Sequence, residues 1–191
     1  SFKDSIVKSG VPSDKVMFWP QYAEDFYKPV DIKETDNIHN ELPKGFNIIY
    51  TGNFGEAQKL ETAIEAASVT AMDYPDINWI FMGGGRDEAN IRNRAEKLGL
   101  INKNVFFIGR KPAEDVCKYL SVCDAALLIL KDMPLLNITL PAKIQSYFAC
   151  GIPVIASCSG EGAETVKKAQ AGITCEAENP KKLAEIAISM Y

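Results

Sequence analysis

One lysine stands at the start of a predicted helix, where a cation is unusual. The segment Leu140-Pro141-Ala142-Lys143 opens a helical pattern that ends near Gly151 and is followed at once by a short apolar run. Lys143 therefore falls in the first helical turn, where the helix dipole disfavours positive charge. A bound anion would remove this conflict. Lys143 is thus a candidate phosphate ligand, although a solvated surface lysine explains the pattern equally well.

Two glycine-rich segments each follow a predicted strand. They are Thr51-Gly52-Asn53-Phe54-Gly55-Glu56-Ala57-Gln58 and Gly83-Gly84-Gly85-Arg86. Glycines in such places let backbone N–H groups approach a phosphate closely. Neither segment has the GxGxxG spacing of a dinucleotide-binding loop, and glycines after a strand more often serve only the turn. Each segment taken singly is a weak indication of a ligand.

The elements that must position these segments alternate between short apolar runs and longer stretches of helical period. The predicted strands are 46–50, 78–82, 105–108, 125–130, 153–156 and 172–175, and the predicted helices are 60–72, 87–98, 113–121, 142–150, 163–169 and 181–190. Strands that are apolar on both faces and alternate with helices indicate an α/β fold with a doubly wound, Rossmann-like parallel sheet. The loops after such strands share one edge of the sheet, where ligands bind. The three candidate segments are therefore expected to meet.

The first 45 residues do not follow this alternation. We assign residues 1–45 to a preamble and linker and residues 46–191 to the domain. Within the preamble, residues 2–9 predict a short helix, residues 16–19 a short strand that Pro20 stops, and residues 31–44 a polar linker. We expect the preamble to pack on the domain or to cross towards a neighbouring one.

Charge and cysteine content exclude several classes of protein. The chain has 21 Lys and Arg, 25 Asp and Glu and a formal net charge of -4, without a basic run. This balance argues against a nucleic-acid partner, which needs a clustered basic face. The five cysteines are odd in number, form no CxxC pair and lie mostly in apolar segments. They are expected to be reduced core residues, which favours a cytoplasmic protein.

Other chemistries lack their motifs. There is no Walker loop, no GxSxG elbow and no cysteine or histidine cluster for a metal. His39, the one histidine, lies in the predicted linker, so catalysis by histidine is not expected within this chain. No apolar run reaches the roughly 18 residues of a membrane span. The chain starts without Met and stops inside a predicted helix, so we expect it to be a piece of a longer protein.

Five motifs follow one another in order along the chain. They are Tyr50-Thr51-Gly52-Asn53-Phe54-Gly55, then Phe81-Met82-Gly83-Gly84-Gly85, Val105-Phe106-Phe107-Ile108-Gly109, Cys123-Asp124-Ala125, and Leu140-Pro141-Ala142-Lys143 with the segment 149–156. This series resembles the C-terminal half of a GT-B glycosyltransferase. It is most similar to the large retaining family 4, and within it to a branch common in capsule and O-antigen synthesis. The resemblance runs from about residue 16 to the end.

The resemblance implies a site for a nucleotide-diphosphate sugar, with no metal and no separate cofactor. By position, Gly52, Asn53, Gly55 and Gln58 would approach the diphosphate, Gly83 and Gly85 would line the nucleotide pocket, and Arg110 and Lys111 would read the base edge. Lys143 would neutralise a phosphate oxygen and so act as the catalytic cation. The diphosphate of the donor would then be the counterion of Lys143.

The chain departs from the family at charged positions. Many members have an arginine and a lysine where this chain has Asn53 and Gln58, and two glutamates where it has Ile138 and Ser146. The second glutamate commonly holds the ribose. Ser146 would do this more weakly, unless Glu161 or Glu164 takes over.

The resemblance implies transfer of a hexose, with retention, to a glycan or lipid-linked acceptor in bacterial polysaccharide or lipopolysaccharide synthesis. The acceptor would bind to a preceding domain, so this chain alone is expected to bind donor without turnover. That domain could also touch the inner face of the cell membrane. Two alternatives stay open: a nucleotide-sugar 2-epimerase, and a non-catalytic partner subunit that only binds the nucleotide sugar. A Rossmann-like domain without any ligand is a further reading of the same residues.

Overall fold

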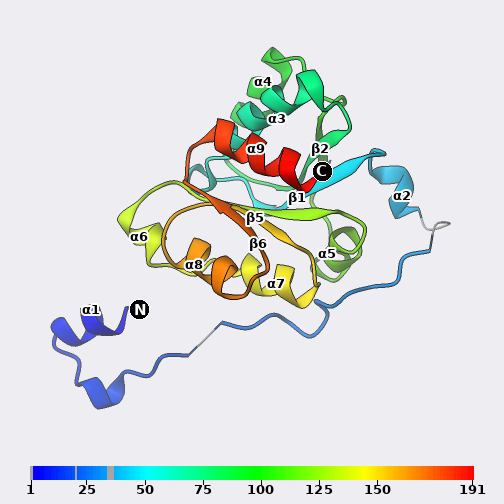
Figure 1. Cartoon of the computed structure of the whole chain (residues 1–191). Helices are drawn as coiled ribbons and strands as arrows, with labels where there is room; N and C mark the ends of the chain where they lie inside the picture. Colours follow the sequence, from blue (N-terminus) through cyan, green and yellow to red (C-terminus); the bar gives the residue numbers. More distant parts are fainter. Residues whose placement is uncertain (1, 20, 34–36) are drawn as a thin grey trace.

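A six-stranded, fully parallel sheet forms the centre of the computed structural model, which describes residues 2–19, 21–33 and 37–191 (Figure 1). The strands are β1 Phe46–Asn53, β2 Ile77–Gly84, β3 Val105–Gly109, β4 Ala125–Ile129, β5 Val154–Ser157 and β6 Gly172–Cys175. Their spatial order is β3-β2-β1-β4-β5-β6. The chain reverses its direction of travel across the sheet between β1 and β4, and this switch point is where doubly wound sheets bind ligands.

Helices cover both faces of the sheet. The helices of the domain are α3 Glu61–Asp73, α4 Glu88–Lys97, α5 Ala113–Leu120, α6 Pro134–Asn137, α7 Lys143–Ala149, α8 Glu161–Lys168 and α9 Pro180–Met190, with a short 3-10 turn at Glu56–Gln58. One apolar core joins the sheet to α3, α4 and α9, and a second joins it to α5, α7 and α8. Figure 1 shows these two groups of helices above and below the sheet.

The predicted architecture is confirmed. Each of the six predicted strands overlaps an observed strand, and all pairs are parallel. Gly52 pairs in register with Gly83, so the two glycine-rich segments leave the sheet side by side. The short helix α6 was not predicted, because four residues are too few to show a helical period.

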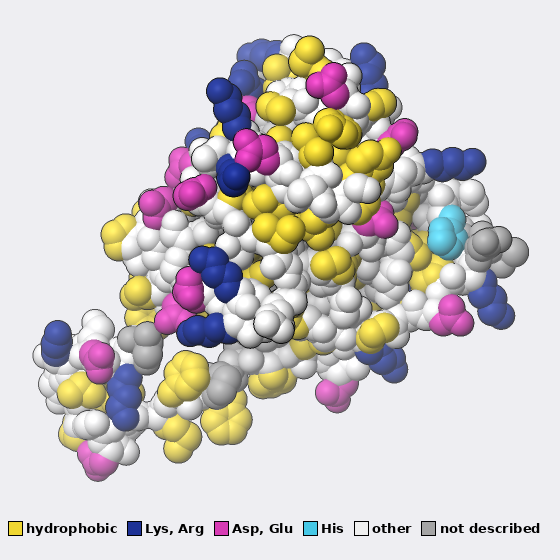
Figure 2. All heavy atoms as spheres, viewed as in Figure 1, with side chains coloured by type: hydrophobic (Ala, Val, Ile, Leu, Met, Phe, Trp, Pro, Cys, Tyr) yellow, Lys and Arg dark blue, Asp and Glu magenta, His cyan; other side chains and the backbone are white. Residues whose placement is uncertain are grey.

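The preamble is only partly as predicted. The predicted helix at 2–9 is present as α1 Lys3–Lys8, but the strand predicted at 16–19 is wrong: these residues are irregular, and Met17, Phe18 and Trp19 are largely exposed. A strand needs a neighbour to pair with, and this segment extends away from the sheet (Figure 1). Figure 2 shows its apolar side chains gathered outside the body of the domain. Pro20 lies outside the described residues.

The rest of the preamble packs on the domain, as expected. The backbone N–H of Val30 donates to the Ser121 hydroxyl at 2.9 Å. The predicted linker contains a short helix, α2 Ile38–Glu41, and the Ile38 side chain is buried in the core beside α5. Its residues 34–36 lie outside the described part of the chain. All five cysteines are free thiols, and Cys117, Cys150, Cys158 and Cys175 are buried, as predicted.

Candidate functional site

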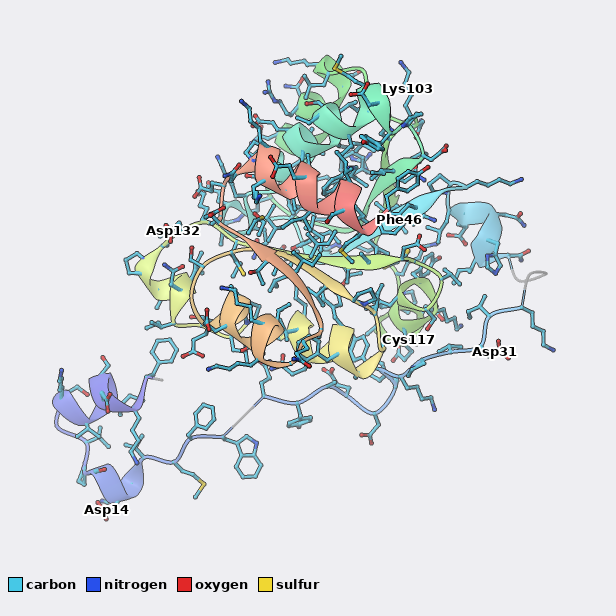
Figure 3. All side chains as sticks on the ribbon, viewed as in Figure 1. Asp14, Asp31, Phe46, Lys103, Cys117 and Asp132 are labelled. Atoms are coloured by element: carbon cyan, nitrogen blue, oxygen red, sulfur yellow. The ribbon has the colours of Figure 1, made fainter. Side chains whose placement is uncertain are left out.

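A cavity of about 500 Å³ opens at the carboxyl ends of β1, β2 and β3. Its floor is formed by residues 51–53 and 82–84, one side by residues 110–116, and another by the start of α7. Gln21, Tyr22, Glu24 and Tyr27 of the preamble close the remaining side. In Figure 3, Asp132, just beyond the carboxyl end of β4, and Phe46, at the amino end of β1, lie at opposite ends of the sheet. The cavity belongs to the Asp132 end.

Lys143 begins α7 and lines this cavity. Its Nζ donates a hydrogen bond to the Tyr50 hydroxyl at 2.9 Å and lies 4.2 Å from the centre of the Tyr50 ring. A Cβ built on Gly52 would be 3.5 Å from the same Nζ, so the ammonium group lies over Gly52, near the carboxyl end of β1. The predicted meeting of Lys143 with the glycine-rich loop is therefore confirmed.

The electrostatic state of Lys143 is unusual. Burial lowers the pKa of its ammonium group from the ordinary 10.5 to about 8. Within the described part of the chain, none of the ion pairs includes Lys143. A desolvated cation without a counterion favours either loss of its proton or the arrival of an anion. The cavity can therefore offer a phosphate group a cation that water stabilises poorly.

The two glycine-rich segments form one continuous surface. The Phe54 N–H donates to the Gly84 carbonyl at 3.1 Å, and the Asp87 N–H donates to the Phe54 carbonyl at the same distance. Gly83 has a φ of +141°, and a Cβ there would come within 1.8 Å of the Gly52 carbonyl oxygen. The positive φ at position 83 and its close approach to the Gly52 backbone therefore both require glycine there.

Two further cations lie on the β3 side of the cavity. Arg110 Nη2 donates to the Gly84 carbonyl at 3.2 Å, which keeps the guanidinium group near the glycine-rich surface. Lys111 Nζ pairs with Glu41 of α2 at 2.5 Å and lies 5.3 Å from the Tyr119 ring centre. Arg110 is thus the more available of the two for a ligand.

Ser146 also lines the cavity, one turn after Lys143, as the i, i+3 spacing on α7 predicts. Burial raises the pKa of Tyr27, and a hydrogen bond between its side chain and Ser146 acts in the opposite direction. The Ser146 side chain therefore contacts Tyr27 of the preamble as well as the cavity. Tyr147 lies deeper, and its hydroxyl accepts from the Thr51 N–H at 3.2 Å.

Several residues assigned to the site from the sequence lie outside the cavity wall. The Gln58 side chain turns back and accepts from the Gly55 N–H at 3.2 Å, so both residues close the turn after β1. Gly85 lies against the Phe54 carbonyl, which a Cβ there would approach to 2.2 Å. Glu161 and Glu164 are exposed in the first turn of α8, and Glu164 pairs with Lys167 at 3.3 Å. Their role as ribose ligands stays a prediction.

Sequence reasoning missed two features of the site. Tyr50 lies inside β1, and its position in the strand predicts only burial. Nothing in the local sequence indicates that its hydroxyl accepts a hydrogen bond from Lys143, a residue of the cavity wall. The preamble segment 21–27 has no periodicity at all, so nothing local indicates that it walls the cavity. Both features depend on which distant segments the fold brings together.

The described ranges, 2–19, 21–33 and 37–191, contain no group of three or more His, Cys, Asp or Glu side chains arranged to hold a metal ion. They also contain no helix with the length and apolar character needed to cross a membrane. The His39 side chain, the cyan group in Figure 2, is exposed on the surface and is not part of the cavity wall.

The chain matches a known protein family. Residues 31–191 match the family described as "Glycosyl transferases group 1". A putative colanic acid biosynthesis glycosyl transferase, WcaI, from Escherichia coli is 28% identical over 155 residues, which are 79% of this chain and 37% of WcaI. A GDP-mannose-dependent monoacylated alpha-(1-6)-phosphatidylinositol monomannoside mannosyltransferase from Corynebacterium glutamicum is 31% identical over 137 residues, 68% of this chain and 34% of that protein. The chain thus spans little more than a third of these relatives.

Among solved structures, HepE from Anabaena in complex with UDP and glucose is similar, with a TM-score of 0.73. The sequence identity is 16%, and the match covers 98% of this chain and 50% of HepE. At this identity the likeness concerns the fold: the Rossmann-like domain has the architecture of half of a GT-B glycosyltransferase, as predicted.

Proposed function

Because the chain belongs to the group 1 glycosyl transferases, we propose that it is the donor-binding part of a retaining hexosyltransferase. It would hold a nucleotide-diphosphate sugar, and a preceding domain would hold a glycan or lipid-linked acceptor of polysaccharide or lipopolysaccharide synthesis. The proposal needs no separate cofactor. With a lipid-linked acceptor, the reaction would take place at the cytoplasmic face of the cell membrane.

One observation carries this proposal: beside two glycine-rich loops, the cavity presents an ammonium group that has no carboxylate partner among the described residues. Lys143 supplies the charge, and the missing side chain at Gly52, which faces the Lys143 ammonium group, allows close approach of a phosphate. Arg110 adds a second cation at the cavity wall. A diphosphate is the leaving group of the reaction, so the charge that develops on it would be stabilised by these groups.

The similar proteins differ in the nucleotide base and the sugar that their names give. HepE is described in complex with UDP and glucose, whereas the corynebacterial relative is described as GDP-mannose-dependent. We propose that the base lies on the β3 side, near Arg110 and Lys111, and the ribose near Ser146. Glu161 and Glu164 lie outside the cavity wall, so a role of either carboxylate at the ribose would need a contact from α8 that forms on binding.

A thermal-shift panel of UDP- and GDP-sugars tests the donor class. A true donor at a hundred times its dissociation constant should raise the free energy of unfolding by about 2.7 kcal/mol. AMP and inorganic sulfate at the same concentrations serve as controls for unspecific anion binding. No shift with any nucleotide-diphosphate sugar in this chain or in a chain extended by its preceding domain would exclude the proposed function.

Ser146→Glu is expected to tighten the binding of the matching nucleoside diphosphate about fivefold. A carboxylate that accepts from ribose hydroxyls contributes about 1.5–3 kcal/mol, whereas a neutral hydroxyl contributes about 0.5–1.5 kcal/mol. Calorimetry on both proteins gives the comparison, and Ser189→Glu on α9, outside the cavity wall, is the matched control. Equal affinities with an intact fold would mean that another residue holds the ribose.

A non-catalytic partner subunit is the second candidate. Its support is that Ile138 and Ser146 stand where many family members have glutamates. Such a subunit would bind the nucleotide sugar without consuming it. An assay of hexose transfer by the chain joined to its preceding domain, with the identified donor, separates the two candidates.

A further inference from the structure

We propose that Tyr50 is a positioning residue for the donor's diphosphate, because its hydroxyl links the Lys143 ammonium group to Asn53 at the carboxyl end of β1. This inference rests on the proposed function. Tyr50 is fully buried and forms no part of the cavity wall, so it would act through Lys143 rather than on the donor itself.

The hydrogen bonds around the Tyr50 hydroxyl have a fixed direction. Its one proton is donated to the Asn53 carbonyl at 2.7 Å, which leaves only acceptor capacity for Lys143 Nζ at 2.9 Å. Burial raises the pKa of Tyr50 far above its usual value, so the hydroxyl keeps this proton. The three groups therefore form a chain in which each partner sets the orientation of the next.

The Tyr50 ring is itself held in place. It packs against Phe54 and Phe81, with centroid distances of 6.0 and 6.5 Å. The ammonium group lies 4.2 Å from the ring centre, within the range of a cation–π interaction. A flexible lysine side chain thus has two attachments, the ring face and the hydroxyl, on one rigid residue.

This contact also connects the two layers of the domain. Tyr50 belongs to the core that includes α3, whereas Lys143 begins α7, whose core residues Ile144 and Tyr147 lie on the opposite face of the sheet. The two side chains meet at the sheet edge beside Gly52, where no side chain intervenes. Placing the cation before the ligand arrives removes an ordering cost from binding.

Tyr50→Phe tests the inference, since it keeps the ring and removes only the hydroxyl. The expected result is about tenfold weaker binding of UDP or GDP, whichever the wild-type chain binds, and unchanged binding of the corresponding nucleoside, uridine or guanosine. Tyr74→Phe, a tyrosine outside the cavity wall, should change neither affinity. Circular dichroism and thermal unfolding verify the fold of each variant.

A double-mutant cycle with Lys143→Met separates positioning from a general disturbance. If Tyr50 acts through Lys143, Tyr50→Phe should cost no further affinity in the Lys143→Met background. An unchanged affinity in Tyr50→Phe, a loss equal for nucleoside and diphosphate, or a full additional loss in the double variant would each overturn the inference. If the wild-type chain bound neither UDP nor GDP, the failure would instead lie with the proposed function.

Discussion

Replacing Lys143 by methionine is expected to weaken the binding of the matching nucleoside diphosphate by about 10- to 100-fold. Hydrogen bonds to charged groups contribute about 1.5–3 kcal/mol, and Lys143 is a cation in the cavity wall without a carboxylate partner among the described residues. Methionine keeps most of the apolar stem, so the packing against Tyr50 is largely retained. Isothermal titration calorimetry measures the difference.

The same substitution should remove a pH dependence. The pKa of Lys143 is lowered to about 8, so in the free protein raising the pH from 7 to 9.5 removes its charge and should weaken diphosphate binding. Arg110 stays charged throughout this range, and the pKa of Lys111 is raised by its hydrogen bond to Glu41. The affinity of the methionine variant should therefore be nearly flat over this interval.

The pH dependence of folding stability gives an independent check. Raising the pH should weaken diphosphate binding but should increase the free energy of unfolding. Between about pH 8 and 10.5 the unfolded chain binds a proton at Lys143 that the folded chain has lost, so the free energy of unfolding of the wild-type protein should rise with pH relative to the methionine variant. Lys103→Met, at an exposed site remote from the cavity residues (Figure 3), is the control for loss of one surface charge. Equal pH profiles for wild type and Lys143→Met would contradict the assignment of a lowered pKa.

Gly83→Ala is expected to lower the free energy of unfolding by about 3–5 kcal/mol and to abolish donor binding. The left-handed φ of +141° strains any other residue, and the new Cβ would come within 1.8 Å of the backbone oxygen of Gly52. A clash between two backbones cannot be relieved by a side-chain rotation, so β1 and β2 must separate at the cavity floor. Urea denaturation and calorimetry measure the two effects.

Gly99→Ala is the matched control for this substitution. Gly99 also has a positive φ, of +68°, but nothing lies within 4 Å of the position of its Cβ. Only the conformational cost of about 1–2 kcal/mol should appear, with donor binding unchanged. A Gly83→Ala loss no greater than that of Gly99→Ala would show that the β1 and β2 loops can move apart freely.

The sequence by itself determined the architecture, because the two features that encode it are local. Apolar runs such as 125–130 mark buried strands, helical period marks the crossovers, and the rules of parallel sheets then bring the ends of β1 and β2 to one edge. The prediction that Lys143 and Gly52 meet follows from the same rules. It required no knowledge of any side-chain contact.

The boundaries of the site needed the tertiary structure. The side chain of Gln58 has the chemistry of a phosphate ligand, yet it bonds the Gly55 N–H and closes its own turn. The apolar pattern of residues 16–19 is that of a strand, yet among the described residues it pairs with no neighbouring strand. In both cases local residue type was compatible with two outcomes, and the surroundings selected one.

Only the tertiary structure decided the electrostatic state of Lys143. Its partner, Tyr50, is 93 positions away in sequence, and their contact depends on the register of β1 and the placement of α7. The lowered pKa follows from burial, which is a property of the packed molecule. Periodicity specifies which face a residue occupies, whereas the partner and the solvation of its polar tip are set by distant segments that meet only when the whole sheet has formed.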